Sequence, residues 1–223
     1  ETLAPAIARV WRDEVDEIRR DLGIWVQKLV DEKDWRPAYF EFSFGLNDAG
    51  RDPRSLPEPV LVDGRFVLRG SVDLIEHRAD FDLLRITDHK TGKNRSHPDL
   101  VVGGGGALQP VLYSLAIEQG LGKKVFSGRL FYATTVGGFV GNEIPINEYT
   151  RGQGLQVLEI SDRAVETGFL PAAPADRACT SCDFRPVCGP REQERTKRKA
   201  KDRLADLAAL RGMRSCRPQT PRP

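Results

Sequence analysis

The chain has 223 residues, of which 39% are hydrophobic and 30% are charged, with a formal net charge of +2. These values are typical of a globular domain, exclude intrinsic disorder, and allow a hydrophobic core without disulfide bonds. No apolar run approaches the ~18 residues of a membrane-spanning helix, and no signal peptide or GxxxxGK[ST] phosphate loop is visible. We therefore expect a cytoplasmic protein with no membrane partner and no NTP-driven motor of that class.

The first half of the chain predicts one long helix followed by strands. Apolar residues recur every three or four positions over residues 3–30, the pattern of an amphipathic helix. Aromatic residues around Glu41 then predict a strand. Strands near residues 59–62 and 65–76 are joined by Asp63-Gly64, a strong hairpin signal. A strand at residues 83–89 completes a predicted antiparallel meander.

The second half of the chain predicts further helices around another strand pair. A glycine-rich loop leads into a helix over residues 107–119, and strands at 125–136 and 139–145 turn at Gly137-Gly138. Helices are also predicted over residues 152–167 and, as a basic helix, over roughly 191–211. Strands flanked by helices at both ends, with a meander in the middle, predict a mixed α/β domain.

Charge is unevenly distributed along the chain. Residues 191–223 contain 11 Lys and Arg against 4 Asp and Glu, a net charge of +7, which leaves −5 on the remainder. A basic tail on a mildly acidic body indicates a polyanionic partner, with nucleic acid the first candidate. A solvated helix face is the alternative interpretation.

Two acidic residues and a lysine lie at the ends of neighbouring predicted strands. Asp73 is near the end of the strand 65–76, and Asp88 and Lys90 end the next strand two positions apart, so they share one face while His89 points away. If the chain turns near Asp80, Asp73 comes close to Asp88. Two carboxylates that close repel each other unless a cation lies between them, and oxygen ligands favour Mg²⁺ or Mn²⁺ over zinc.

A metal at this position suits phosphodiester hydrolysis. It lowers the pKa of a bound water and neutralises charge that develops on the phosphate. Lys90, on the same face, would hold the attacking water and stabilise the transition state. A D-x-K triplet alone is a weak signal, so the surrounding residues decide its weight.

The order of these residues resembles the PD-(D/E)xK nuclease superfamily. Gly70-x-x-Asp73 followed by Asp88-His89-Lys90-Thr91-Gly92 is similar to its motifs, and the closest branch is that of the RecB-like nuclease domains, including those of AddAB-type helicase–nucleases. Glu41, Gln109-x-x-x-Tyr113 and the cysteines near the C-terminus match in the same order. The resemblance implies a restriction-endonuclease-like core with a mixed central sheet flanked by helices.

The resemblance also implies roles for individual residues. It implies a magnesium or manganese site. Its ligands would be the side chains of Glu41, Asp73 and Asp88 and the backbone carbonyl of His89. Lys90 would activate the water. Gln109 and Tyr113, four positions apart on one helical face, would orient the substrate.

The chain departs from the family pattern in two places. Leu74 and Glu76 stand where the family often has Arg and Asp, neither of which is a core metal ligand in the family. The family also has a metal-proximal His on a helix before the first strand, whereas residues 3–30 contain no His. We expect that this ligand either precedes Glu1 or is missing, which fits a chain that begins partway through its domain.

Three of the four cysteines form a C-x2-C-x5-C cluster, namely Cys179, Cys182 and Cys188. This spacing favours a shared metal over disulfides. The resemblance implies a structural [4Fe–4S] cluster whose fourth ligand is a cysteine before Glu1 or else Cys216, with zinc as the lesser alternative.

The sequence therefore predicts a nuclease domain over residues 1–190 and a basic helix and tail over residues 191–223. We expect a magnesium-dependent deoxyribonuclease, an exonuclease by family resemblance, acting with a helicase subunit or helicase-like domain in double-strand break processing. One alternative is a catalytically inactive DNA-binding or scaffolding module. Another is a zinc ribbon appended to an unrelated α/β fold. Cleavage polarity stays open.

Overall fold

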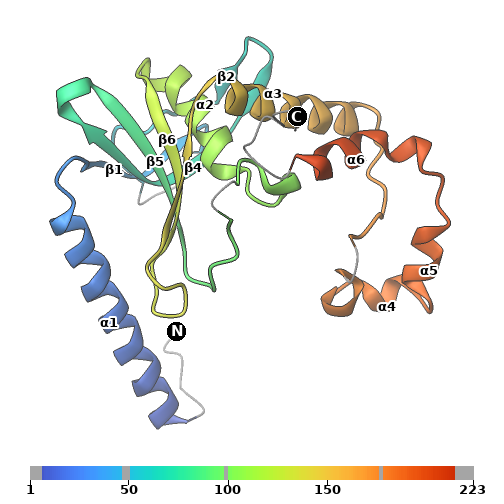
Figure 1. Ribbon diagram of the computed structural model, residues 1–223, viewed down its shortest axis with the longest axis horizontal. Helices are drawn as coiled ribbons and strands as arrows, with labels where there is room; N and C mark the ends of the chain where they lie inside the picture. The colour runs from blue at the N-terminus through green and yellow to red at the C-terminus, as the bar shows by residue number, and fades with distance from the viewer. Residues whose placement is uncertain (1–6, 47–50, 98–99, 176–177, 214–223) are drawn as a thin grey trace, which may run out of the picture.

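A computed structural model describes residues 7–46, 51–97, 100–175 and 178–213. Its centre is a five-stranded mixed sheet in the order β1-β4-β5-β6-β7. The strands are β1 (Arg36–Phe44), β4 (Gly70–Arg78), β5 (Leu83–Lys90), β6 (Val125–Tyr132) and β7 (Gly141–Pro145). Neighbouring strands are antiparallel except β5 and β6, which are parallel. The predicted mixed α/β, restriction-endonuclease-like architecture is confirmed (Figure 1).

The predicted strand over residues 65–76 is wrong, because its two halves pair with different partners. β3 (Phe66–Leu68) pairs with β2 (Val60–Val62) in a separate two-stranded sheet, and β4 pairs with β1. The β2–β3 turn is the predicted one: Asp63 and Gly64 have φ of 54° and 67°, as a tight hairpin turn requires. The meander therefore runs β1-β4-β5, and Asp73 lies near the start of its strand.

Two helices cover one face of the central sheet. α2 (Gln109–Leu121) connects the parallel strands β5 and β6, and α3 (Glu148–Glu166) packs beside it. Their apolar side chains close the main core with residues of the sheet, including Phe42, Val72, Ile75, Ile86, Leu115, Ile117, Val125 and Leu158. Gly128 of β6 allows this packing, because a Cβ there would collide with the carbonyl of Pro110.

The other face of the sheet contains a buried ionic network. Glu76 is fully buried and accepts hydrogen bonds from Arg85 at 2.7 and 2.8 Å, from Arg129 at 3.0 and 3.1 Å, and from Thr87 Oγ1 at 2.8 Å. Burial alone would raise the pKa of Glu76, but the Arg85 hydrogen bonds and the two guanidinium charges outweigh it and lower the pKa. The network joins β4, β5 and β6 through their side chains.

α1 (Ala8–Asp31) extends away from the sheet, as Figure 1 shows. It is fixed to the sheet by two sets of hydrogen bonds. Asp21 Oδ1 accepts from the backbone N–H and the hydroxyl of Thr135, at 3.1 and 2.6 Å. Trp25 Nε1 donates to His89 Nε2 at 3.1 Å. The helix predicted over residues 3–30 is thus present, with residues 1–6 outside the described part.

Other element boundaries shift by a few residues. α3 begins earlier than predicted because Asn147 and Thr150 form a capping box ahead of it. β6 and β7 are shorter than predicted, since residues 133–140 form the turn between them. The helix predicted from residue 107 begins at Gln109.

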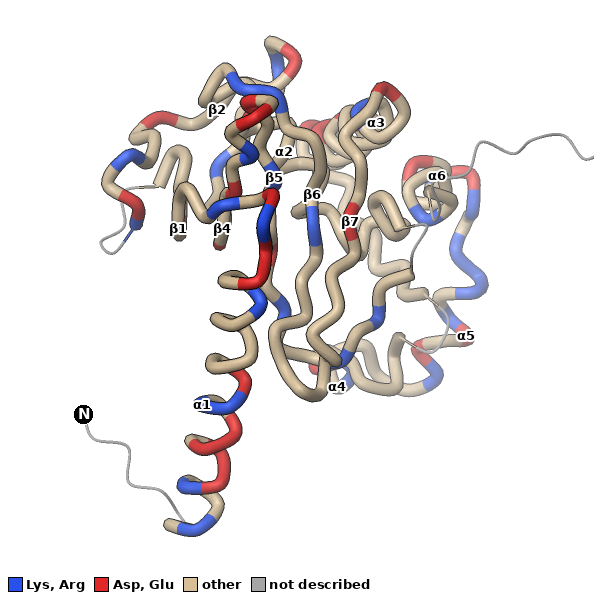
Figure 2. The backbone as a smooth tube through the Cα atoms, turned by 60° about the vertical axis from the view of Figure 1, so that its left-hand side comes forward, with Lys and Arg blue, Asp and Glu red and all other residues tan. Residues whose placement is uncertain are grey.

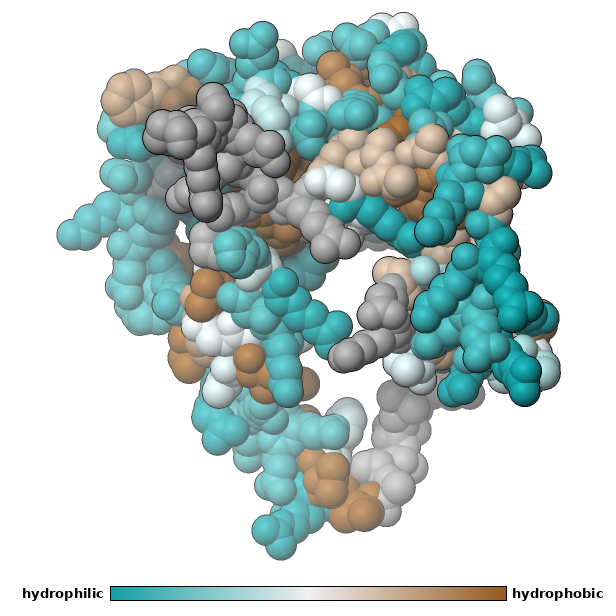
Figure 3. All heavy atoms as spheres, turned by 45° about the vertical axis from the view of Figure 1, so that its right-hand side comes forward, coloured by the Kyte–Doolittle hydropathy of each residue, from teal (hydrophilic) through white to brown (hydrophobic). Residues whose placement is uncertain are grey.

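The single basic helix predicted over residues 191–211 is wrong. The C-terminal part consists of short pieces: η3 (Ala178–Ser181), α4 (Arg185–Cys188), α5 (Glu192–Lys197), η4 (Asp202–Leu204) and α6 (Ala205–Gly212). Residues 191–201 have no apolar stripe to bury, so packing does not support a continuous helix there. Figure 3 shows the outlying part of this segment as mostly hydrophilic, with open space between it and the main body. No helix within the described ranges is long and apolar enough to cross a membrane.

Candidate active site

The central sheet opens between β4 and β5. Their ladder ends at the pair Leu74–Thr87, whereas β4 continues to pair with β1 and β5 continues to pair with β6. The next residues on the two strands are Asp73 and Asp88, and the chain turns between the strands through η1 (Ala79–Phe81), as predicted near Asp80. We call this opening, bounded by Asp73 and Asp88, the fork.

Asp88 is the most buried carboxylate of the fork, with 4% of its surface exposed. Burial raises its pKa, the charge of Asp73 raises it further, and Lys90 opposes both effects. Lys90 Nζ lies 2.6 Å from Asp88 Oδ2, yet this buried oxygen makes no hydrogen bond of acceptable geometry with any described residue. The fork thus contains a desolvated carboxylate oxygen that has both a second negative charge and the Lys90 ammonium as neighbours.

Asp73 and His89 meet at the mouth of the fork. Asp73 Oδ2 accepts a hydrogen bond from the backbone N–H of His89 at 2.7 Å. The imidazole of His89 packs between the rings of Trp25 and Phe131, on the opposite side of β5 from Lys90. Burial lowers the pKa of His89, which favours the neutral ring. The predicted orientation of His89 is therefore found, and a tryptophan of α1 contacts it.

Glu41 approaches the fork from β1. It stands opposite Asp73, between the pairs Phe40–Leu74 and Phe42–Val72, and its φ of 49° marks an irregular strand at this point. A cavity of about 300 Å³ is lined by Glu41, Asp73 and His89 with their neighbours. The carboxylate of Glu41 is paired with Arg51 Nη1 at 2.9 Å, and the same nitrogen donates to Ser71 Oγ at 2.8 Å.

Of the two predicted site residues of α2, Gln109 contacts the fork, and Tyr113 packs against the start of β4. Gln109 Oε1 accepts a hydrogen bond from Lys90 Nζ at 2.8 Å. The ring of Tyr113 lies over Gly70, where a Cβ would be 3.0 Å from Tyr113 Cε1, and packs edge-on against Phe44. A side chain at Gly70 would therefore press against the rings of Tyr113 and Phe44. The shared helical face predicted for Gln109 and Tyr113 is observed.

The donor chemistry at the fork fits a hard divalent cation. Asp73 and Asp88 supply carboxylate oxygens whose mutual repulsion a cation would relieve, and Asp88 Oδ2 lacks a hydrogen bond. Across the described residues, however, no group of three or more His, Cys, Asp or Glu is placed to hold a metal ion. Glu41, the third expected ligand, is engaged by Arg51.

The cysteine cluster lies in the C-terminal part. Cys179 is buried, whereas Cys182 and Cys188 are exposed. Burial raises the pKa of Cys179, and so do the negative charges of Glu192 and the other two cysteines. Within the described ranges the three thiols do not form a group placed to hold a metal ion. Cys216 lies outside the described residues.

Two contacts at the site were not predicted from the sequence. Arg51 belongs to a loop without periodic pattern, and Trp25 belongs to a helix that reads as a simple amphipathic repeat. Arg51 contacts Glu41 across a loop, and Trp25 contacts His89, which is 64 positions later in the chain, so no periodic pattern identifies either contact.

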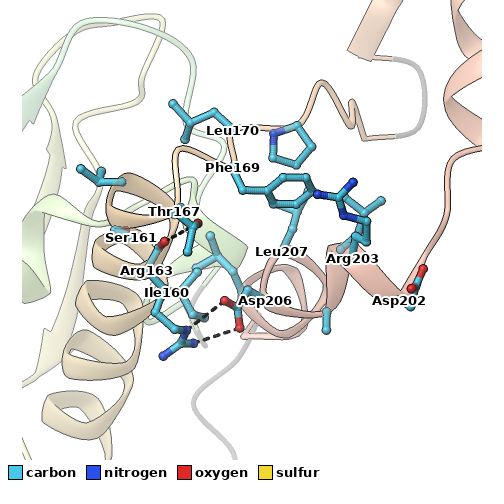
Figure 4. A pocket seen from close by; sticks show the side chains of 16 residues that line it. Ile160, Ser161, Arg163, Thr167, Phe169, Leu170, Asp202, Arg203, Asp206 and Leu207 are labelled. Atoms are coloured by element: carbon cyan, nitrogen blue, oxygen red, sulfur yellow. Dashed lines mark hydrogen bonds and ion pairs between the residues drawn. The ribbon is translucent and has the colours of Figure 1, made fainter.

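A further cavity is remote from the fork. It has a volume of about 630 Å³ and lies between α3 and the C-terminal helices, where Ile160, Phe169 and Leu207 line it (Figure 4). An ion pair between Arg163 and Asp206 joins the two helices at its side. None of the residues of the fork lines this cavity.

Comparison with known families agrees with this geometry. The model of the PD-(D/E)XK nuclease superfamily matches residues 2–189, which include the fork, α2 and the cysteine cluster. The chain belongs to this superfamily, and the resemblance seen in its motifs is confirmed at that level. No curated protein matches the chain significantly.

Proposed function

We propose that this chain is a magnesium-dependent DNA nuclease with the fork as its active site. One observation supports this most strongly: the opening of the sheet brings Asp73, Asp88 and Lys90 together, and α2 adds Gln109 to the same place. The membership of a nuclease superfamily supports the same conclusion. Phosphodiester hydrolysis is the reaction that such a set of groups suits best.

The residues of the fork divide the work between metal binding and substrate activation. Asp73 and Asp88 would hold the metal, with Glu41 and the backbone carbonyl of His89 as further ligands. A bound Mg²⁺ lowers the pKa of a water molecule that it holds, and it places positive charge near the phosphate.

The second task falls to Lys90 and α2. Gln109 Oε1 holds the ammonium of Lys90 beside Asp88, where it orients the attacking water and stabilises negative charge on the phosphate. The amide nitrogen of Gln109 and the hydroxyl of Tyr113 are available to orient the strand.

The finer assignment rests on the motifs. We propose an exonuclease of the RecB-like branch, located in the cytoplasm and acting with a helicase in double-strand break processing. The competing candidate is a catalytically inactive DNA-binding module. It is favoured by the ion pairs of Glu41 with Arg51 and of Asp88 with Lys90, which a metal ion would have to displace or share.

A cleavage assay separates the two candidates. Wild-type protein should degrade DNA with added Mg²⁺ or Mn²⁺ and not with EDTA, and Asp88→Asn and Lys90→Ala should each reduce the rate by more than about 100-fold. Lys93→Ala, an exposed lysine three positions from Lys90, serves as the control and should retain the activity. DNA binding without cleavage under any metal condition would establish the inactive module.

We further propose that the cysteine cluster binds a structural [4Fe–4S] cluster, with the fourth ligand before Glu1 or at Cys216. The C-x2-C-x5-C spacing of the three cysteines in the sequence supports it. Anaerobic purification with iron, sulfide and zinc analysis tests it. Iron and sulfide in cluster stoichiometry, lost in Cys182→Ser, would support the cluster, whereas zinc without iron would contradict it.

A further inference from the structure

A second cavity adjoins the fork and shares Lys90 with it. It has a volume of about 250 Å³ and is lined by the loop after β5, by β6 and by the start of α2. Its polar lining side chains are those of Lys90, Arg95, Ser96, Gln109 and Tyr132, and none of its lining residues is acidic. The cavity shares Lys90 and Gln109 with the fork, so a group bound in it would lie next to the reacting phosphate.

The loop that presents Arg95 is fixed by hydrogen bonds. The backbone N–H of Arg95 donates to the hydroxyl of Tyr132 at 3.4 Å, and Asn142 of β7 donates to the hydroxyl of Ser96. The guanidinium of Arg95 itself makes no ion pair with any described residue. Arg95 is therefore a cation at the wall of the cavity that has no ion-pair partner in the described part of the chain.

The remaining groups at the cavity are also suited to an anion. α2 begins at Gln109 without a side-chain cap, so the positive end of its dipole lies at this wall, although Pro110 in its first turn has no N–H to donate. The amide nitrogen of Gln109 donates to no described residue, since only its oxygen is engaged, by Lys90. The volume is below the about 300–1,000 Å³ of typical small-molecule pockets, which favours a phosphate with its sugar over a whole nucleotide.

We propose that this cavity binds a phosphate group of the nucleic-acid strand, adjacent to the phosphate that is cleaved at the fork. This inference rests on the proposed function and adds a substrate-positioning subsite to it. Arg95 is the residue that neutralises this phosphate. The phosphate is either an internal one or the terminal phosphate of a strand, and the chemistry of recognition is the same for both.

Binding of single-stranded DNA in EDTA tests the subsite without any cleavage. A fluorescein-labelled 20-mer is titrated with wild-type protein, Arg95→Ala and Lys93→Ala. Lys93 is the matched control, because it is an exposed cation of the same loop that does not line the cavity. Arg95→Ala should weaken binding about tenfold and reduce the slope of log K against log salt by about 0.7, whereas Lys93→Ala should change affinity less than about twofold.

Neutral linkages identify the phosphate that Arg95 contacts. Replacing single phosphates of the 20-mer by methylphosphonates, or removing a terminal phosphate, should weaken wild-type binding at one position and leave Arg95→Ala unaffected there. If wild-type affinity falls when an internal linkage is neutralised, Arg95 contacts an internal phosphate. If it falls when a terminal phosphate is removed, Arg95 contacts that terminal phosphate. Equal effects of Arg95→Ala and Lys93→Ala, or identical profiles for wild type and Arg95→Ala, would overturn the subsite.

The outcome is separable from that of the cleavage assay. A wild-type protein that cleaves DNA while Arg95→Ala binds normally would remove the subsite and leave the proposed nuclease intact. An effect specific to Arg95 in a protein that never cleaves would support the subsite and remove the nuclease.

Discussion

The carboxylate of Asp88 is buried beside Asp73, and both burial and this neighbouring charge raise its pKa. Its ionised form is therefore less favourable in the folded, metal-free protein than in the unfolded chain. Lys90 offsets part of this effect, since its ammonium lies 2.6 Å away. A residue selected for stability alone would be neutral at this position, which is why we assign Asp88 a role in metal binding.

At this scale we expect Asp88→Asn to stabilise the metal-free protein at pH 7, by about 1 kcal/mol in urea unfolding, because it removes a buried charge without changing the shape. The folded state binds the Asp88 proton more tightly than the unfolded state, so the penalty in the wild type grows as pH rises through about 4. The stability gained by Asp88→Asn should thus vanish in acid. The control Asp80→Asn, in the exposed turn, should leave the free energy of unfolding unchanged. An Asp88→Asn protein less stable than the wild type would contradict the expectation.

At the scale of elements, the sheet depends on side chains as well as on its ladders. The Glu76 network joins three strands on the face opposite α2, and Arg85 also stacks on Trp35, with its guanidinium 4.7 Å from the ring centroid. The strands so joined are the ones that bear Asp73, Asp88 and Lys90. The network therefore fixes the distance between the strands of the fork from the face of the sheet opposite α2.

We expect Glu76→Gln to lower the free energy of unfolding by about 3 kcal/mol. It removes the carboxylate that pairs with the buried guanidinium of Arg129, and it leaves Arg85 with Glu32 as its counter-charge among the described residues. The pKa of Glu76 is lowered in the folded state, so its contribution is present above about pH 4.3 and is lost as pH falls through the folded value. Urea unfolding at pH 7 measures the effect, with the exposed Glu58→Gln as control. Equal stabilities of the two variants would show that the network contributes nothing.

At the scale of the whole molecule, acidic and basic regions are separated. Figure 2 shows mixed charges along α1 and a largely basic connection between α5 and α6. Lys197, Arg198 and Lys201 of this region form no ion pair with a described residue. Unpaired cations of this kind are available to contact phosphates outside the active site.

We expect Lys197→Gln, Arg198→Gln and Lys201→Gln together to reduce the salt slope of single-stranded DNA binding by about 2, at about 0.7 per lost phosphate contact. Nonspecific affinity should fall while the metal dependence of cleavage is retained. A charge-matched control is a triple variant in which three arginines of α1 are changed to Gln, namely Arg12, Arg19 and Arg20. A slope equally reduced by both triple variants would assign the effect to net charge alone.

Much of the fork could be predicted because its residues are close in the sequence. The alternation of a strand places Asp88 and Lys90 on one face, and the helical repeat places Gln109 and Tyr113 on another. The break between β3 and β4 could not be predicted, since it depends on which distant strand each half pairs with.

Contacts that depend on how loops and helices fold back were out of reach for the same reason. The pairing of Glu41 with Arg51 crosses a loop that has no periodic pattern, and that of Trp25 with His89 joins α1 to β5. The basic segment was predicted as one helix from its composition, but the absence of an apolar face decides its structure.

Binding of Mn²⁺ tests most directly whether the fork is a metal centre, because it requires no knowledge of the substrate and thiolates compete poorly for this ion. Calorimetric titration of metal-free wild type, Asp73→Asn, Asp88→Asn and the control Asp80→Asn is the measurement. We expect the wild type and the control to bind Mn²⁺ alike, and each of the two fork variants to bind it at least about tenfold more weakly. Unchanged binding in both fork variants would contradict the assignment of the fork as the active site.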